Sequence, residues 1–184
     1  QLMIWVILAV LVLLVIWFVA TYNGFVSLRN RVDEAFSTMD VYLVKRYDLI
    51  PNLVETVKGY TKHESETLEK VIKARNAAVS ATTPAEKLES ETELAGTLSR
   101  LFALTEAYPE LKANTNFMNL QDQLNKMEGE IANARKYYNG VVKTFNTKCE
   151  TIPSNIIAGI CGFVKQPMFV VQDESQRDSV KVQF

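Results

Sequence analysis

The residues whose types first suggest chemistry are the single histidine and its neighbour, His63-Glu64. A zinc metalloprotease site needs a second histidine one helical turn further on, and Thr67 stands there instead. Because His63 is the only histidine, the paired Glu-x-x-His motifs of di-iron bundles cannot be built either. Phosphate-binding glycine loops, Gly-x-Ser-x-Gly elbows and Cys-x-x-Cys pairs are also missing from the sequence. We therefore expect no catalytic residue, no cofactor and no metal site, with His63 solvated or hydrogen-bonded.

Polar residues on apolar helical stripes are a second candidate site. The set comprises Arg46, Glu64, Arg75, Glu128, Arg135, Asn139 and Asn146. Helical spacing turns several of them toward the seams between helices, where a buried charge is costly unless it is paired. One interpretation is a set of ion pairs that fixes helix register. The other is a polar seam, formed by Arg46, Glu64, Arg75, Glu128 and Arg135, that accepts a small anion.

A membrane anchor is predicted at the start of the chain. Residues 2–20 are nineteen consecutive apolar residues, and the first charge is Arg29. As a helix this run spans about 28 Å, close to the ~30 Å hydrocarbon core of a bilayer. The run is too long for a cleaved signal peptide, and Phe18 stands where cleavage after Ala20 would require a small residue. We expect a single-pass span that contacts membrane lipid through residues 2–20.

Charge and cysteine content place limits on compartment and partners. Arg29 and Arg31 just beyond the span favour a cytoplasmic location for the rest of the chain. Cys149 and Cys161 are too few to form a disulfide framework. Lys and Arg total 20 against 21 Asp and Glu, with the signs interspersed, so we expect no nucleic-acid partner.

The period of the apolar residues predicts an all-α protein. From residue 25 to 152 they recur every three or four positions, and breaks fall near Pro51, at Thr82-Thr83-Pro84 and at Pro109. Four long amphipathic helices with short connections predict an antiparallel up-and-down four-helix bundle that continues directly from the transmembrane helix. Asp48 is a plausible cap for a helix that starts at Pro51. The alternative is one helix that continues through Pro51 and leaves a three-helix domain.

The pattern changes after Pro153, and three regions result: an anchor (1–21), a helical bundle (22–152) and an apolar hook with a C-terminal tail (153–184). Residues 156–164 are apolar but too short to cross a bilayer, so the hook packs on the bundle or at the membrane surface. Residues 168–171 and 180–184 favour strand, which predicts a short irregular or strand-forming tail.

Many short and unusual strings follow one another in the chain. They include Arg46-Tyr47-Asp48-Leu49-Ile50-Pro51-Asn52-Leu53-Val54, Val57-Lys58-Gly59-Tyr60, Glu106-Ala107-Tyr108-Pro109-Glu110-Leu111-Lys112-Ala113, Ala134-Arg135 and Tyr138-Asn139. In these strings and their order the chain resembles the LemA family of bacterial membrane proteins. The chain departs from the family pattern at Phe36 and Tyr42, where Trp and Gln are usual. The resemblance implies one N-terminal membrane helix followed by a helical bundle, no enzyme activity and, by analogy with magnetosome membrane proteins, a role in membrane organisation.

Two functional hypotheses follow. The first is a membrane-anchored scaffold or adaptor that forms a homo-oligomer and presents its helices to an unidentified protein partner. Its candidate interaction surface comprises Tyr22, Asn23, Ile156, Ile157 and Phe163. The second is a membrane-tethered sensor that binds a small anion in the polar seam.

Overall fold

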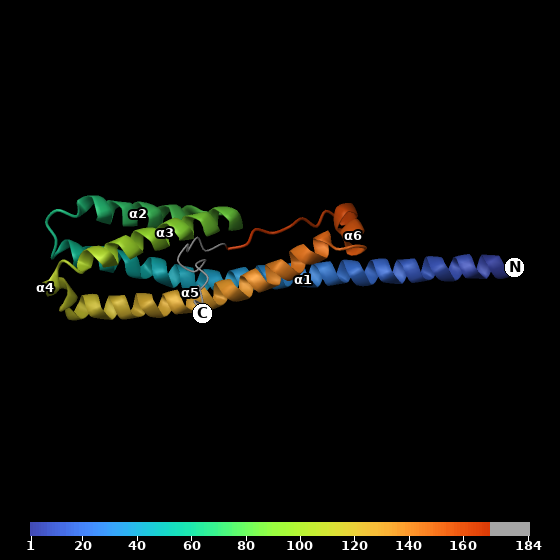
Figure 1. The fold of residues 1–184 in the computed structure, drawn as a ribbon, viewed down its shortest axis with the longest axis horizontal. Helices are drawn as coiled ribbons and strands as arrows, with labels where there is room; N and C mark the ends of the chain where they lie inside the picture. The colour runs from blue at the N-terminus through green and yellow to red at the C-terminus, as the bar shows by residue number, and fades with distance from the viewer. Residues whose placement is uncertain (170–184) are drawn as a thin grey trace, which may run out of the picture.

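The computed structural model describes residues 1–169, and this part of the chain contains helices and no strands, as the all-α prediction requires. The elements are α1 (Leu2–Lys58), α2 (Ser65–Ser80), α3 (Pro84–Thr105), α4 (Pro109–Lys112), α5 (Thr115–Glu150) and α6 (Ser154–Cys161). Figure 1 shows a helical body around the C-terminal part of α1, from which the N-terminal part projects alone. Within the body α1 lies along α5, and α2 lies along α3.

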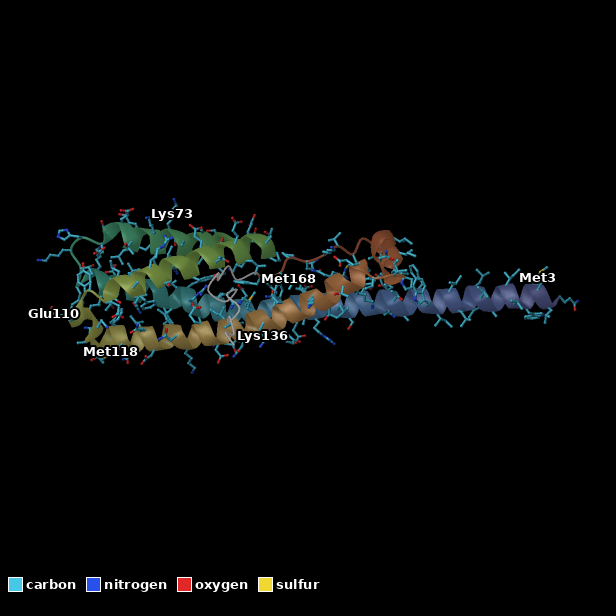
Figure 2. The ribbon with its side chains drawn as sticks, viewed as in Figure 1. Met3, Lys73, Glu110, Met118, Lys136 and Met168 are labelled. Atoms are coloured by element: carbon cyan, nitrogen blue, oxygen red, sulfur yellow. The ribbon has the colours of Figure 1, made fainter. Side chains whose placement is uncertain are left out.

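The projecting part of α1 is the one helix of the described chain that is long and apolar enough to cross a membrane. Its most apolar stretch has a mean hydropathy of 3.2, and none of it is buried in the structure. Met3 lies near its free end, and no other helix covers the side chains around it in Figure 2. The structure therefore leaves the predicted anchor free to contact lipid.

Helix α1 continues through Pro51, so the prediction of a second helix that begins at Pro51 is wrong. Asp48 lies inside α1 and caps nothing. The chain turns instead between Gly59 and Glu64, and α2 follows as a separate helix. The alternative prediction was thus right about continuity at Pro51, although residues 1–169 still contain four long helices, α1, α2, α3 and α5.

Two helix starts agree with the sequence. Thr83 accepts a hydrogen bond from the backbone N–H of Glu86, whose carboxylate in turn lies within hydrogen-bond distance of the Thr83 N–H. This reciprocal capping box satisfies backbone donors that the first helical turn leaves unpaired. At α5 the Asn114 side chain accepts from the N–H of Phe117 in the same way.

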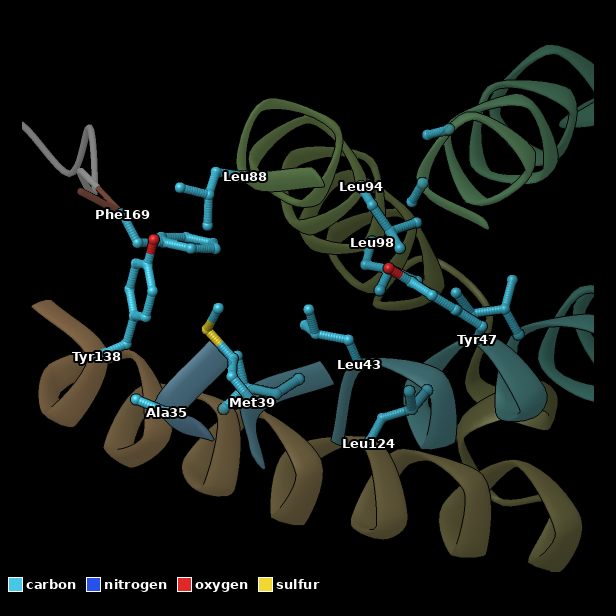
Figure 3. Close-up of a cluster of buried hydrophobic side chains, with 14 of the residues drawn as sticks. Ala35, Met39, Leu43, Tyr47, Leu88, Leu94, Leu98, Leu124, Tyr138 and Phe169 are labelled. Atoms are coloured by element: carbon cyan, nitrogen blue, oxygen red, sulfur yellow. The ribbon is translucent and has the colours of Figure 1, made fainter. Parts of the chain in front are cut away.

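The core lies where α3 and α5 face the middle of α1. In Figure 3 the side chains of Met39 and Leu43 on α1 lie among Leu88 and Leu94 on α3 and Leu124 on α5. All five are buried. Burial of this apolar surface is the main force that holds these helices together.

The hook is partly helical. Residues 154–161 form α6, whose Ile157 and Ala158 are buried. Gly162 ends α6 with φ of 75°, a left-handed conformation that favours glycine, and the chain then turns Phe163 back into the core cluster. Residues 163–169 run on without helix or strand. The strand predicted at residues 180–184 lies outside the described residues, as do residues 170 and 171 of the one predicted at 168–171. Residues 168 and 169 are not in a strand.

Candidate functional site

Arg46 is the centre of a buried ion cluster between three helices. It lies on α1 with only 2% of its surface exposed. Its guanidinium donates one hydrogen bond to Glu91 on α3 and another to Glu128 on α5. Glu91 is itself buried, whereas the Glu128 side chain is about half exposed at 47%. The arginine therefore joins α1 to α3 on one side and to α5 on the other.

Lys87 extends the same cluster toward α2. Its ammonium group donates to the carbonyl oxygen of Ala78, 3.1 Å away, and lies 3.5 Å from the carboxylate of Asp40 on α1. The ammonium nitrogen also lies 5.0 Å from the centre of the Tyr47 ring, a cation–π contact. The Lys87 contacts thus connect α3 to α1 and α2, and the negative charge of Asp40 acts on the nearby Glu91 carboxyl.

Burial raises the pKa of the Glu91 carboxyl to about 7. The charge of Arg46 and its hydrogen bond act in the opposite direction, while the negative charges of Glu128 and Asp40 add to the rise. One carboxylate oxygen of Glu91 is buried with no hydrogen-bond partner. Glu91 therefore binds a proton more readily than an ordinary glutamate does.

The predicted polar seam is divided in the structure. Arg46 and Glu128 meet, and Arg135 lies about two turns further along α5. Burial lowers the pKa of the Arg135 guanidinium, although Glu128 opposes this shift. Glu64 lies elsewhere, in the turn before α2, where it accepts a 3.0 Å hydrogen bond from the hydroxyl of Tyr108. Arg75 lies on α2.

Arg75 has a specific backbone partner. Its Nε donates a 3.0 Å hydrogen bond to the carbonyl oxygen of Tyr47 in α1. In a regular helix that oxygen accepts from the N–H of the residue four positions later, and here that residue is Pro51, which has no N–H. Arg75 therefore supplies the donor that Pro51 lacks and fastens α2 to α1 at the same point.

Sequence reasoning missed Glu91, Lys87 and Asp40. A signal for Glu91 was present, because it continues the three- and four-residue spacing of Leu88, Leu94 and Leu98 on the buried stripe of α3. An acidic residue at a stripe position predicts a buried partner of opposite charge. The sequence does not indicate which of its 20 basic residues that partner is.

Asn139 and Asn146 hold the C-terminal segment against α5. The Asn139 amide donates to the carbonyl oxygen of Phe169 at 2.8 Å and accepts from the Phe169 N–H at 2.7 Å. Asn146 makes the same pair with Gln166, at 3.0 and 2.8 Å. The two asparagines are seven residues, or about two turns, apart and so share a face of α5. Both asparagines bind backbone groups of the extended segment and none of its side chains. We call this pair of residues the asparagine clamp.

Contacts of aromatic side chains add to the asparagine clamp. The hydroxyl of Tyr138 donates to the carbonyl oxygen of Pro167 at 2.9 Å, and burial raises the pKa of that hydroxyl. The guanidinium of Arg135 lies 5.4 Å from the centre of the Phe169 ring. Figure 3 shows this ring beside Tyr138 and Leu88. Phe169 thus connects the segment to the core between α3 and α5.

The candidate interaction residues divide into buried and exposed groups. Phe163 is buried: its ring stacks on Phe25 at 4.8 Å, nearly parallel, and meets Tyr22 at 5.7 Å. Ile157 is buried as well, whereas Asn23 and Ile156 are exposed. Tyr22 remains 39% exposed. A free surface at this end of the body therefore comprises Tyr22, Asn23 and Ile156, but not Ile157 or Phe163.

The contacts described for these groups join helices to one another. His63 is exposed in the turn before α2, and within residues 1–169 no three His, Cys, Asp or Glu side chains gather as metal ligands. In the ion cluster the guanidinium of Arg46 already has two carboxylate partners. An anion would have to displace Glu91 or Glu128 to reach it. The ion cluster of Arg46, Glu91 and Glu128 is therefore better suited to holding the helices together than to binding an anion.

A candidate membrane helix that runs without interruption into a helical body defines a class of anchored helical proteins. Within that class the chain belongs to the LemA family, whose family model matches residues 35–184. This confirms the family resemblance seen in the sequence.

Individual relatives agree with the family. The chain is similar to Protein LemA of Metamycoplasma hominis, with 27% identity over 145 residues, and covers 77% of its own length but only 65% of the relative's. It is similar to the magnetosome protein MamQ 2 of Paramagnetospirillum magneticum, with 25% identity across 86% of this chain and 69% of that protein. Magnetosome protein MamQ of Magnetospirillum gryphiswaldense is 23% identical across 88% of this chain and 71% of its own.

Proposed function

We propose that this protein is a membrane-anchored, non-enzymatic scaffold that associates with copies of itself and presents its helical body to a protein partner. The observation that carries the proposal is the continuity of α1: one helix of 57 residues contains both the apolar span and the main helix of the body. A helix without a break transmits position and orientation, whereas a flexible linker would not. The body is therefore held at a fixed place relative to the membrane.

The buried contacts support this role because they make the body a rigid unit. Arg46 joins three helices, Arg75 fastens α2 to α1, and the asparagine clamp holds the segment that follows α6. In this proposal α1, α2, α3 and α5 act as one antiparallel four-helix bundle. A rigid bundle suits repeated protein contacts because little conformational entropy is lost on binding.

Two relatives supply the cellular context of the proposal. They are magnetosome proteins. We infer by analogy that this chain also serves in a membrane-bound assembly in a bacterium, with its body on the cytoplasmic side of the membrane and no nucleic-acid partner. Fold and family alone do not assign a reaction, so the proposal includes none.

The mass of the purified protein tests self-association. The full-length chain in a mild detergent is compared, by light scattering, with a version that begins at Tyr22. A discrete oligomer of the full-length chain is expected. If the oligomer persists without residues 1–21, its interface lies in the body; if it disappears, the span forms the interface. Strictly monomeric full-length protein at all concentrations, with no crosslinked partner from its native membrane, would overturn the proposal.

A further inference from the structure

Helix α6 has two apolar faces, and only one of them is covered. Ile157 and Ala158 are buried against the body, at 1% and 4% exposure. On the other face Ile156 and Ile160 are 55% and 70% exposed. A helix that packs on a body in water usually presents a polar outer face. The outer face of α6 is instead made of isoleucine.

Exposed apolar residues also flank α6 on both sides. Ile152, just before the helix, is 84% exposed, and Val164, just after it, is 67% exposed. No Asp, Glu, Lys or Arg occurs from residue 151 to residue 164. Four exposed large apolar side chains in one short uncharged stretch indicate a contact with a membrane or another macromolecule.

The position of α6 indicates which of these contacts it makes. Phe163, directly after α6, stacks on Phe25 of α1, which lies five residues, or about 8 Å, beyond the last residue of the apolar run, Ala20. Trp17, inside that run, packs against the same hydrophobic cluster. Figure 1 shows α6 beside α1 where α1 leaves the body. If residues 2–20 span the bilayer, α6 is held at the level of the lipid headgroups.

Basic side chains surround the same junction. The guanidinium of Arg29 lies 5.4 Å from the centre of the Phe163 ring, and the ammonium of Lys148 lies 4.9 Å from that of Phe25. Arg31 on α1 is exposed as well, and Lys165, which follows Val164, is exposed and forms an ion pair with Glu150. Cations beside an apolar face are the combination that interfacial helices use to bind membranes containing anionic lipid.

We propose that α6 lies in the headgroup region of the bilayer that α1 crosses, with the exposed apolar side chains of Ile152, Ile156, Ile160 and Val164 against the acyl chains. The body is then attached to the membrane at two points, which fixes its rotation about the axis of α1. This inference rests on the membrane insertion of α1, which is part of the proposed function, and not on self-association.

Fluorescence quenching in lipid nanodiscs tests the docking of α6. A bimane label is placed on the full-length chain at Ile160→Cys, after Cys149→Ser and Cys161→Ser. A matched label is placed at Ile72→Cys, an exposed isoleucine on α2. The nanodiscs contain phosphatidylcholine and phosphatidylglycerol and hold one protomer each. One quencher is iodide in water, and the other is a nitroxide on the lipid acyl chain.

The label at position 160 is expected to be quenched by the acyl-chain nitroxide and shielded from iodide, with its emission shifted to the blue. The label at position 72 is expected to show the reverse. Equal iodide quenching at the two positions overturns the docking of α6. Shielding from both quenchers also overturns it, because protein rather than lipid then covers the face. Since each disc holds one protomer, failure of self-association leaves these results unchanged.

A second variant separates docking from folding. A label at Val164→Cys is compared with and without the pair Ile156→Asn and Ile160→Asn, whose side chains are exposed and leave the core intact. Lipid quenching at position 164 is expected to fall in the variant, while its melting temperature in detergent stays unchanged. Undiminished lipid quenching would show that the exposed isoleucines do not hold α6 at the membrane.

Discussion

The Nε atom of Arg75 lies 3.0 Å from the carbonyl oxygen of Tyr47, the one backbone acceptor in α1 that Pro51 leaves without its helical donor. A proline inside a helix normally kinks or ends it, at a cost of about 3 kcal/mol or more. Part of that cost is the unpaired carbonyl, and here a side chain from another helix pairs with it. The same hydrogen bond therefore offsets part of the cost of Pro51 in α1 and attaches α2 to α1.

Removal of this donor is expected to destabilise the protein only while the proline is present. Arg75→Met should lower the free energy of unfolding by about 1 to 3 kcal/mol, because Tyr47 then keeps an unsatisfied carbonyl. In a Pro51→Ala background the same substitution should cost less, since the alanine backbone supplies its own N–H. Urea unfolding of the four proteins of this double-mutant cycle measures the coupling. Equal losses in both backgrounds would contradict the assignment.

Pro51 shows which features of the fold could not be predicted from the sequence. The spacing of the apolar residues predicted helix both before and after Pro51, because helical periodicity is a local property. The donor that replaces the missing N–H of Pro51 comes from Arg75, which is 24 positions further along the chain and reaches Tyr47 only after the helices pack. The helix starts near Pro84 and Asn114 were predictable for the opposite reason, since their capping partners lie within three residues.

The ion cluster and the asparagine clamp also join residues that lie far apart in the sequence. Glu91 follows the spacing of the α3 stripe, but its partner Arg46 is 45 positions away. The apolar residues of the irregular segment 163–169 show no helical or strand spacing. Its position depends on hydrogen bonds from its backbone to Asn139 and Asn146, which the segment's own sequence does not indicate. A sequence pattern identifies residues that are unusual for their surroundings, and the folded chain determines which partner each one meets.

Loss of Arg46 is expected to be among the most damaging single changes in the body. Arg46→Met leaves Glu91 buried without its partner and should cost about 3 to 5 kcal/mol. The double variant with Glu91→Leu should recover much of this loss, because an apolar pair of similar volume needs no compensation. Chemical unfolding of the single and double variants checks the prediction. A double variant as unstable as the single one would show that the pair does more than balance charge.

The raised pKa of Glu91 predicts an unusual pH dependence. Because its pKa of about 7 in the folded protein exceeds the ordinary value of 4.5, the folded chain binds a proton that the unfolded chain has already released between these values. The free energy of unfolding should therefore fall as the pH rises from about 4.5 to 7, by up to about 3 kcal/mol, and change little above that.

Glu91→Gln is the control for this pH effect, because it removes the titrating group and keeps the side-chain shape. The difference in unfolding free energy between the parent protein and the variant should change across this same pH interval. Parallel curves for the two proteins would show that another group is responsible.

The asparagine clamp predicts a local effect on amide hydrogen exchange. The N–H groups of Phe169 and Gln166 donate to Asn139 and Asn146, respectively. Asn139→Ala removes two hydrogen bonds worth about 1 kcal/mol each, so exchange at Phe169 should accelerate about thirtyfold. Asn125→Ala, at an exposed position on the same helix, should leave both amides unchanged. Unaltered protection at Phe169 in Asn139→Ala would mean that other contacts hold the segment.

The rigidity of α1 between membrane and body is the basis of the scaffold proposal, and a distance between spin labels tests it most directly. Nitroxides are placed at Val15→Cys in the span and Val44→Cys in the body, both exposed, in a full-length chain whose two native cysteines are serine. Labelled protein is diluted with unlabelled protein in nanodiscs, so that distances within one protomer dominate. A continuous helix places these positions about 44 Å apart, so one narrow distribution near that value is expected. A broad distribution, or one centred at a much shorter distance, would contradict the rigidity of α1.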